Sequence, residues 1–345
     1  MSDLELHLLN DFQRDFPLVP APFGVIAGRM GVSEDDVLVT LNRLQACGKV
    51  SRVGAVFRPH SIGSSTLAAL AVPAEDLDEV ARLVSDYAEV NHNYEREHRY
   101  NLWFVVTAAN EARVCEVLSD IESRTGYQPL HLPMLEDFHI DLGFDLSRPH
   151  KGSSVSPRDA GARSRPHRIL QQPSETALIG AIQCGLPIVP HPFAEIGACI
   201  RLSEREVIDS LAHLLAQGVI KRMGVVVRHH ELGYRANAMV VWDVPDDRVS
   251  AAGQRVGSCH SVTLCYRRPR RLPAWRYNLF TMIHGQSRDE VLGLVEQLKA
   301  QCGLNDVPHE ILFSRRRFKQ CGARYVADSA VEQTGVRRAA SGSVG

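Results

Sequence analysis

The feature that most constrains this chain is an internal repeat. The segment PLVPAPFGVIAGRMGVSEDDVLVTLNRLQACGKVSRVGAVFRPHSIG, which begins at Pro17, aligns almost without gaps with PIVPHPFAEIGACIRLSEREVIDSLAHLLAQGVIKRMGVVVRHHELG, which begins at Pro187. The offset is constant at 170 residues in this segment. The second copy then gains a few residues before the similarity resumes, where YNLWFVV from Tyr100 matches YNLFTMI from Tyr277. A chain of 345 residues with this repeat contains two copies of one module.

Each copy is predicted to contain two domains. In the first copy, residues 3–60 have the pattern of three helices followed by a short hairpin, which is typical of a winged helix-turn-helix. Capping boxes predict the start of the third helix in both copies, and they are formed by Ser33 with Asp36 and by Ser203 with Glu206. The next segment is predicted to alternate as strand 67–72, helix 74–86, strands 89–96 and 100–107, helix 110–124 and strand 131–140. That order predicts a ferredoxin-like βαββαβ sandwich, with two helices on one face of a four-stranded antiparallel sheet.

The predicted fold class is therefore α+β, with two tandem units that each combine these two domains. The expected boundaries are 1–60 and 173–230 for the winged helix-turn-helix domains, 61–147 and 231–327 for the ferredoxin-like domains, 148–172 for a linker rich in Ser, Pro, Gly and Arg, and 328–345 for a flexible tail. Because one face of each sheet carries no helix, we expect the two copies to pair within the chain, and a homodimer is a further alternative.

The composition is that of an ordinary globular protein, with 44% hydrophobic residues, 23% charged residues and a formal net charge of -1. The first residues, MSDLELHLLNDFQRDF, lack the basic region and apolar core of a secretion signal, and no segment approaches the roughly 20 apolar residues of a membrane-spanning helix. We therefore expect a cytoplasmic protein without a membrane partner. Eight cysteines occur without a CxxC pair, which indicates neither a zinc site nor a disulfide framework.

The predicted domain order resembles that of the Lrp/AsnC family, twice, over nearly the whole chain. A narrower similarity lies in HNYEREHRYNLWFVV from His92 and LCYRRPRRLPAWRYNLFTMIHG from Leu264, which resemble signature segments of the two siroheme decarboxylase subunits, here joined in one chain. The resemblance implies conversion of siroheme to 12,18-didecarboxysiroheme, in which two ring acetates lose carbon dioxide and become methyl groups. It also implies a place in heme d1 biosynthesis or in the siroheme-dependent route to heme. No organic cofactor is implied, because the iron is carried by the substrate.

Such a reaction requires cations for the carboxylates that stay, a proton donor, and an apolar slot for the flat ring. Arginines on the hairpins between the middle sandwich strands are the candidate carboxylate-binding residues, because a guanidinium binds a carboxylate through paired hydrogen bonds. They are Arg96 and Arg99 in the first copy and Arg267, Arg268, Arg270, Arg271 and Arg276 in the second. Arg315, Arg316 and Arg317 on the last strand are weaker candidates. For any one of these arginines, a solvated turn is the alternative interpretation.

Strand alternation places His92, Tyr94 and Arg96 on one face, which we assign to the substrate side, with His98 at the turn beyond. His92, His98 and Tyr94 are the candidate catalytic residues. A histidine that titrates near neutrality can protonate a carbanion-like carbon or bind iron through its neutral nitrogen. We expect no metal site of the protein's own, with His92 or His139 as the candidate ligand to the siroheme iron.

The second copy carries Leu264, Tyr266 and Arg268 where the first has His92, Tyr94 and Arg96. The missing histidine favours a division of labour, in which the first copy handles protons and the second binds carboxylates, although each copy could instead bind one ring. Further substrate-binding candidates are Tyr266, Asn101, Trp103 and Asn278, with Phe280 opposite in the repeat; core packing is the alternative for Trp103 and Phe280. Secondary candidates are His139 and His309, while a surface role is expected for His60, His229 and His230 at the wing ends.

The main competing hypothesis is an Lrp/AsnC-type DNA-binding regulator with a tetrapyrrole or other small-molecule effector. Its recognition helix would begin with Glu34, Asp35 and Asp36 in one copy and with Glu204 and Glu206 in the other, and these carboxylates would be repelled by DNA phosphates. DNA is therefore not an expected partner. A carrier or sensor of tetrapyrroles that performs no reaction is a third hypothesis.

Overall fold

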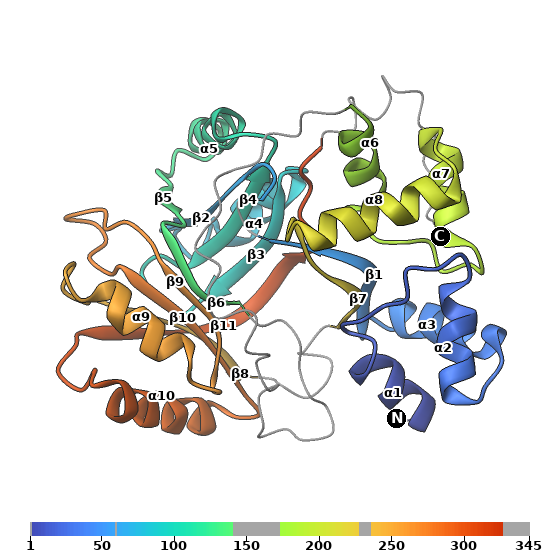
Figure 1. The fold of residues 1–345 in the computed structure, drawn as a ribbon. Helices are drawn as coiled ribbons and strands as arrows, with labels where there is room; N and C mark the ends of the chain where they lie inside the picture. The colour runs from blue at the N-terminus through green and yellow to red at the C-terminus, as the bar shows by residue number, and fades with distance from the viewer. Residues whose placement is uncertain (1, 59–60, 141–172, 228–235, 327–345) are drawn as a thin grey trace. The chain divides into compact units, whose positions relative to one another are not determined.

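The computed structural model describes residues 2–58, 61–140, 173–227 and 236–326 (Figure 1). The predicted linker 148–172, the tail 328–345, and His60, His229 and His230 lie outside the described residues. The chain divides into two compact units. The first unit combines residues 1–64, 165–228 and 321–345, and the second combines residues 65–164 and 229–320. Within the described ranges, no helix has the length and apolar character needed to cross a membrane.

The first unit contains the three helices of each copy. They are α1 (Asp3–Asn10), α2 (Pro22–Met30) and α3 (Glu34–Ala46), and α6 (Pro173–Ile182), α7 (Pro192–Ile200) and α8 (Glu204–Ala216). Both predicted capping boxes are confirmed: the Ser33 hydroxyl accepts from the Asp36 backbone at 3.1 Å, and the Ser203 hydroxyl accepts from the Glu206 backbone at 3.3 Å. The apolar faces of the helices form the core of this unit.

The predicted hairpin within each copy is wrong. Each segment forms a single strand, and β1 (Val50–Phe57) pairs antiparallel with β7 (Ile220–Val227) of the other copy. Gly54 lies opposite Gly224 in this two-stranded sheet. Its φ of 156° and its close approach to the backbone of Gly185 explain the glycine without a turn. The two copies thus share one β-ribbon in place of two wings.

The second unit is built on a nine-stranded sheet in the order β5-β2-β4-β3-β11-β8-β10-β9-β6. In the first copy the strands are β2 (Ser64–Leu70), β3 (Val90–Arg96), β4 (Leu102–Ala108), β5 (Leu130–Pro133) and β6 (Glu136–Ile140). In the second they are β8 (Ala236–Trp242), β9 (Val262–Arg267), β10 (Leu279–Gly285) and β11 (His309–Gln320). The orders β5-β2-β4-β3 and β11-β8-β10-β9 each match a ferredoxin-like sandwich, which confirms that prediction.

The last strand of each copy connects the two sandwiches. The first half of β11 pairs with β8 of its own copy, and the second half pairs with β3 of the first copy. The single strand predicted over 131–140 is instead divided: β5 ends at Pro133, which has no backbone N–H to donate, and β6 crosses to pair with β9. The predicted pairing of the copies within the chain is therefore realised by exchanged strands.

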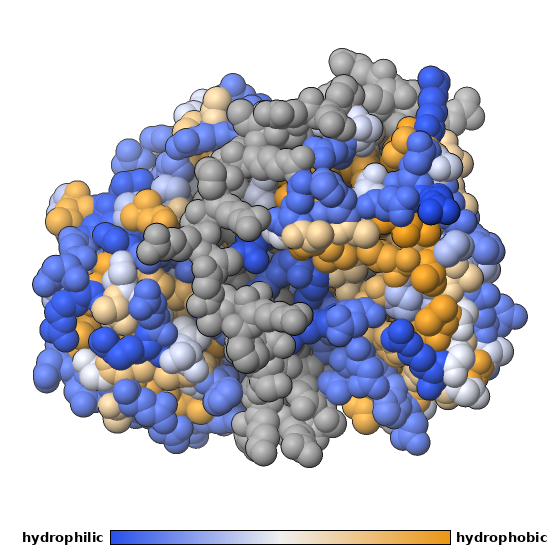
Figure 2. Space-filling view, viewed as in Figure 1, coloured by the Kyte–Doolittle hydropathy of each residue, from blue (hydrophilic) through white to orange (hydrophobic). Residues whose placement is uncertain are grey.

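Helices cover one face of each half of the sheet. They are α4 (Leu77–Asp86) and α5 (Glu111–Thr125) in the first copy, and α9 (Val249–Gly257) and α10 (Arg288–Cys302) in the second. Each pair of helices buries its own apolar cluster against the sheet. In Figure 2, the outward surface over α9 and α10 is a mixture of hydrophilic and hydrophobic residues, as expected for amphipathic helices that bury one side.

The opposite faces of the two halves, which we call the inner faces, share a third apolar cluster. It contains residues from both copies, namely Ala69, Tyr100, Trp103, Leu130, Leu132, Met239, Val241, Trp275, Phe280 and Leu312. Trp103 and Trp275 meet at its centre with ring centroids 5.2 Å apart. The face of each half of the sheet that carries no helix is therefore covered by residues of the other copy.

Gly224 should be the glycine of the first unit that tolerates alanine least. A Cβ there would lie far inside van der Waals distance of the backbone oxygens of Phe12 and Gln13, whereas a Cβ on Gly28 would meet nothing within 4 Å. We expect Gly224→Ala to lower the free energy of unfolding by about 1–3 kcal/mol through overpacking. Gly28→Ala, inside α2, should raise it by roughly 0.5–1 kcal/mol. Urea titrations of the two variants should show shifts of opposite sign; equal midpoints would contradict the close approach.

Candidate functional site

Three predicted site residues of the first copy lie together on the inner face. Tyr94 is paired with Trp103 across the ladder, so both side chains leave the sheet on the same side. The rings of His92 and Tyr94 are stacked with centroids 6.2 Å apart, and the Arg96 guanidinium lies 5.8 Å from the Tyr94 ring centroid. The predicted alternation of His92, Tyr94 and Arg96 is confirmed, and we call these residues the Arg96 set.

Leu264, Tyr266 and Arg268 form the corresponding Arg268 set in the second copy. Tyr266 is paired with Phe280, as Tyr94 is with Trp103. The Arg268 guanidinium lies 5.4 Å from the Tyr266 ring and 5.8 Å from the Phe280 ring. The repeat thus places two tyrosine-arginine pairs at equivalent inner-face positions.

Each of these arginines reaches into the other copy. Arg96 donates from Nη1 to the Leu312 carbonyl at 3.0 Å, and Arg268 donates from Nη1 to the Leu132 carbonyl at 2.5 Å. Leu132 and Leu312 occupy matching positions in HLPMLEDFHI and ILFSRRRFKQ. Arg96 also contacts the Met282 sulfur at 3.9 Å. Arg96 is therefore held by a carbonyl and a thioether and Arg268 by a carbonyl, and none of these groups carries a negative charge.

The electrostatics of the two arginines are unusual. Burial lowers the pKa of both guanidinium groups to about 10, so they remain charged at neutral pH. Among the described residues, the buried Nε of Arg96 and that of Arg268 have no hydrogen-bond partner, and no carboxylate pairs with either group. A buried cation without a counterion is costly, which is why such groups mark anion-binding positions.

His92 is held in one tautomer by the bulge residue beside it. The Asn91 amide donates to the Thr107 hydroxyl at 3.3 Å, and its oxygen faces Nδ1 of His92 at 3.1 Å. That oxygen can only accept, so the Nδ1 of neutral His92 carries the proton and Nε2 carries the lone pair. Nε2 of His92 can therefore take up and deliver a proton.

His98, the second predicted catalytic histidine, is bonded at both ring nitrogens. Nδ1 accepts from the Tyr100 backbone at 2.9 Å, and Nε2 lies 2.7 Å from the Glu310 carboxylate, to which the Tyr277 hydroxyl also donates at 2.6 Å. The His98 ring packs edge-on against Trp275, with centroids 5.4 Å apart. These contacts join residues of the two copies, and they favour a positioning role for His98.

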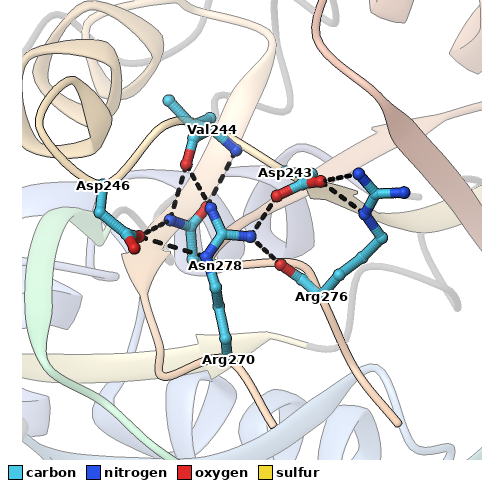
Figure 3. A network of polar contacts seen from close by, with 6 residues as sticks. All are labelled: Asp243, Val244, Asp246, Arg270, Arg276 and Asn278. Atoms are coloured by element: carbon cyan, nitrogen blue, oxygen red, sulfur yellow. Dashed lines mark hydrogen bonds and ion pairs between the residues drawn. The ribbon is translucent and has the colours of Figure 1, made fainter. Parts of the chain in front are cut away.

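The second-copy arginine cluster separates into two kinds of environment. Arg270 is bonded to Asp243, to Asp246 and to the carbonyls of Val244 and Arg276, and Arg276 itself pairs with Asp243 (Figure 3). Their guanidinium groups therefore already have carboxylate partners. Arg268, only two residues before Arg270, has none among the described residues.

The remaining predicted arginines have other partners. Arg267 lies 3.9 Å from Glu136, Arg271 donates to the His131 carbonyl at 2.8 Å, and Arg99 lies 5.8 Å from the Tyr100 ring. Arg315 and Arg316 both pair with Glu95, which alternates away from the inner face on β3. Arg317 is the ladder partner of Tyr94 and donates to the Gln320 side chain at 3.2 Å.

Asn101 and Asn278 fasten the backbone at the end of the first strand in each sandwich. Asn101 donates to the Val72 carbonyl at 2.8 Å and accepts from its N–H at 3.0 Å, and Asn278 does the same with Val244 at 2.8 Å and 3.0 Å. Trp103 is 2% exposed, and its indole N–H donates to the Tyr100 carbonyl at 2.6 Å. For Trp103 and Phe280 the contacts match the core-packing alternative.

The two secondary histidines lie on the helix-covered side of their sheets. His139 is paired with Cys265, and its Cβ lies beside Gly257 of α9, whereas Asp137 is the β6 residue paired with Tyr266. The His309 ring stacks on Trp242 with centroids 4.9 Å apart. Of the two residues predicted as iron ligands, only His92 belongs to the inner face.

Sequence reasoning missed His284 on β10. Its Nδ1 lies 3.1 Å from the Thr263 hydroxyl, and burial together with the nearby charge of Arg96 lowers its pKa to about 4. The signal was present, because His284 follows Phe280 and Met282 at every second position of the strand and so shares their inner face. The first copy has Thr107 at the matching position of the repeat.

Comparisons with known proteins agree with this architecture. The model for the AsnC-like ligand binding domain matches residues 62–139 and 231–319, and that for the siroheme decarboxylase NirDL-like HTH domain matches residues 5–50 and 175–221. The siroheme decarboxylase NirDL subunit of Paracoccus denitrificans is 45% identical over 94% of this chain and 97% of the relative.

Two further similarities bear on the fused arrangement and on the site. The siroheme decarboxylase NirD subunit of Pseudomonas aeruginosa is 53% identical over 42% of this chain and 97% of that subunit. The crystal structure of the siroheme decarboxylase NirDL in complex with an iron-uroporphyrin III analogue is 28% identical, covers 96% of this chain and 97% of the solved chain, and has a TM-score of 0.66. From the relative that matches almost end to end and the domain models that match in both copies, this chain belongs to the siroheme decarboxylase NirDL family.

Proposed function

We propose that this chain is a siroheme decarboxylase, which converts siroheme to 12,18-didecarboxysiroheme by removing two ring acetate carboxyl groups. Family membership and a crystallised relative with a bound iron-uroporphyrin analogue support the substrate class. The observation on this chain that carries the proposal is the pair of buried arginines without carboxylate partners among the described residues. An anionic macrocycle supplies the carboxylates that these cations lack.

The chemistry requires one proton for each carboxyl group lost. The bond between the acetate methylene and its carboxylate breaks, the electron pair stays on the methylene carbon, and a proton converts that carbon to a methyl group as carbon dioxide leaves. His92, two residues from Tyr94, is the proton donor that the geometry favours: Nε2 takes up a proton from water and delivers it from the imidazolium to that carbon, which leaves the neutral ring. Arg96 and Arg268 hold carboxylates and fix the ring.

No separate organic cofactor enters this scheme, since the iron comes with the siroheme. The first turns of α3 and α8 carry acidic residues that cap the helices, which disfavours the regulator hypothesis for these surfaces. The substrate identity fits heme d1 biosynthesis or the siroheme-dependent route to heme.

The test of the proposed function is anaerobic incubation of the purified chain with siroheme, followed by mass spectrometry of the tetrapyrrole. We expect the product to have lost two molecules of carbon dioxide. A shift in the absorption spectrum without a change in mass would mean a carrier or sensor, and would contradict the proposal.

Arg268→Met should separate binding from stability. Removing a buried, uncompensated charge should leave the melting temperature unchanged or higher, since an apolar side chain of similar length needs no solvation. The dissociation constant for iron uroporphyrin III should rise about 10- to 100-fold, as expected for a lost charged hydrogen bond of roughly 1.5–3 kcal/mol.

Arg113→Met is the matched control, because Arg113 lies on α5 and pairs with Glu89 at 2.7 Å and Glu116 at 3.1 Å. Its dissociation constant for the macrocycle should not change. The assignment of Arg268 fails if both variants bind iron uroporphyrin III as the unmodified chain does.

His92→Gln should lower kcat for siroheme by about 100-fold or more while the dissociation constant for iron uroporphyrin III changes by less than about threefold, because proton transfer is lost and the carboxylate contacts remain. Single-turnover assays and absorption titrations measure the two quantities. Unchanged turnover would remove His92 as the proton donor.

A further inference from the structure

Each sandwich has a turn after its first covering helix, and the two turns are built alike. After α4 the Val90 N–H donates to the Tyr87 carbonyl at 3.2 Å, and after α9 the Val262 N–H donates to the Cys259 carbonyl at 3.1 Å. Tyr87 and Cys259 therefore occupy equivalent positions of the repeat. In both copies the side chain at this position contacts the second covering helix, which is α5 or α10.

The side chains that bridge the turn and the helix differ between the copies. In the first copy the Tyr87 hydroxyl donates to the Asp120 carboxylate, and Arg124 donates to that hydroxyl at 3.0 Å. In the second copy Cys259 faces Cys302, the last residue of α10, and the two Sγ atoms are 3.4 Å apart. The polar bridge of the first copy thus corresponds to a pair of thiols in the second.

The positions of these two sulfurs permit a disulfide. Because bonded sulfurs lie about 2.0 Å apart, Sγ atoms at 3.4 Å need to approach by roughly 1.4 Å. Cys259 lies in the turn between the end of α9 and the start of β9, where rotation of the side chain and the irregular backbone both accommodate such a shift. The two cysteines are 43 residues apart in the chain, so the fold and not a local motif brings them together.

The two thiols differ in their access to solvent. Cys259 is partly exposed, whereas Cys302 is 4% exposed. Burial, together with the bond to Cys259, raises the pKa of the Cys302 thiol and keeps that sulfur protonated. An oxidant in solution therefore reaches Cys259 first, with the Cys302 sulfur directly behind it.

We propose that Cys259 and Cys302 form a reversible disulfide when the chain meets a hydroperoxide, with Cys259 oxidised first and Cys302 as the sulfur that completes the bond. The Cys259 sulfur attacks the O–O bond, which breaks, so that the hydroperoxide is reduced to an alcohol or water and the sulfur becomes a sulfenic acid. The Cys302 sulfur then attacks the Cys259 sulfur, and the sulfenic oxygen leaves as water with the Cys302 proton. A thiol reductant reverses the bond by thiol-disulfide exchange.

The disulfide protects Cys259 from further oxidation. A sulfenic acid that finds no neighbouring thiol is oxidised further to sulfinic acid, which thiol reductants do not reverse. With Cys302 beside it, the sulfenic acid of Cys259 is converted to a disulfide instead. Both cysteines belong to the apolar cluster beneath α9 and α10, on the face of the sheet opposite the Arg268 set. The disulfide is therefore independent of the proposed function.

The first test maps the bond in the unmodified chain. The reduced protein is treated with an equimolar amount of hydrogen peroxide, the remaining thiols are alkylated, and a tryptic digest is analysed by mass spectrometry without reduction. We expect VGSCHSVTLCYR, from Val256, to be joined to AQCGLNDVPHEILFSR, from Ala300, through Cys259 and Cys302. The control Cys115→Ser removes an exposed cysteine of α5 and should leave the joined peptides unchanged.

The joined peptides also show which sulfurs react, because fragment ions distinguish Cys259 from Cys265 in the first peptide. No joined peptide after oxidation, or a bond through Cys265, would overturn the proposal.

The second test measures protection. Each protein is treated with excess hydrogen peroxide and then with dithiothreitol, and the fraction of Cys259 that remains as sulfinic or sulfonic acid is determined. Cys302→Ala should raise this fraction about fivefold or more, because the sulfenic acid has lost its partner. Cys265→Ala, which removes another buried thiol of the same cluster, should match the unmodified chain.

Equal fractions in all three proteins would contradict a protective disulfide. Cys302→Val, which is closer to cysteine in volume, takes the place of Cys302→Ala if the alanine variant does not fold, and the same rise is expected.

Discussion

The exchange of last strands between the copies is the constraint on which the inner faces depend. Because β11 pairs with both β8 and β3, and β6 continues from β5 onto β9, the two sandwiches form one continuous sheet order within the second unit. The carbonyls of Leu312 and Leu132 belong to these connecting strands, and they are the acceptors for Arg96 and Arg268. Strand exchange therefore brings each arginine of one copy onto the surface of the other.

If Arg96 and Arg268 bind substrate carboxylates as proposed, the fold gives up stability for binding at these two positions. A core made only of the apolar cluster around Trp103 and Trp275 would cost less free energy to fold than one that also holds two cations with no counterion among the described residues. The contrast with Arg270 is instructive, because Asp243 and Asp246 satisfy that guanidinium as an ordinary surface network does. An excess of positive charge beside apolar rings is unfavourable for the folded chain alone. It is favourable when a flat, polyanionic ligand is bound there.

Much of this architecture could be predicted from the sequence. The constant offset of the repeat, the capping serines Ser33 and Ser203 and the alternation of His92, Tyr94 and Arg96 depend on local rules, and the structure confirms them. The ribbon of β1 with β7 could not be predicted, because a single strand that pairs with a distant copy has the same composition as half of a hairpin. The proline at position 133 indicates where the predicted strand divides. The strand with which β6 pairs, β9, belongs to the second copy, and the local sequence does not identify it.

The arginines show the same limit at the level of the site. Seven arginines in the two hairpins look alike in the sequence, and what separates Arg268 from Arg270 is the position of Asp243, 25 residues before Arg268 in the chain. His284 was hidden by a different cause, since comparison of the two copies draws attention to what they share, and His284 is a place where they differ. Contacts between residues that are distant in the sequence, and not local secondary-structure propensities, decide which of these polar side chains are available for binding.

The most direct measurement is a crystal structure of this chain with iron uroporphyrin III bound. We predict that carboxylate oxygens of the macrocycle lie about 2.7–2.9 Å from guanidinium nitrogens of both Arg96 and Arg268, including the Nε atoms that have no partner among the described residues. A bound macrocycle whose carboxylates contact neither guanidinium would contradict it.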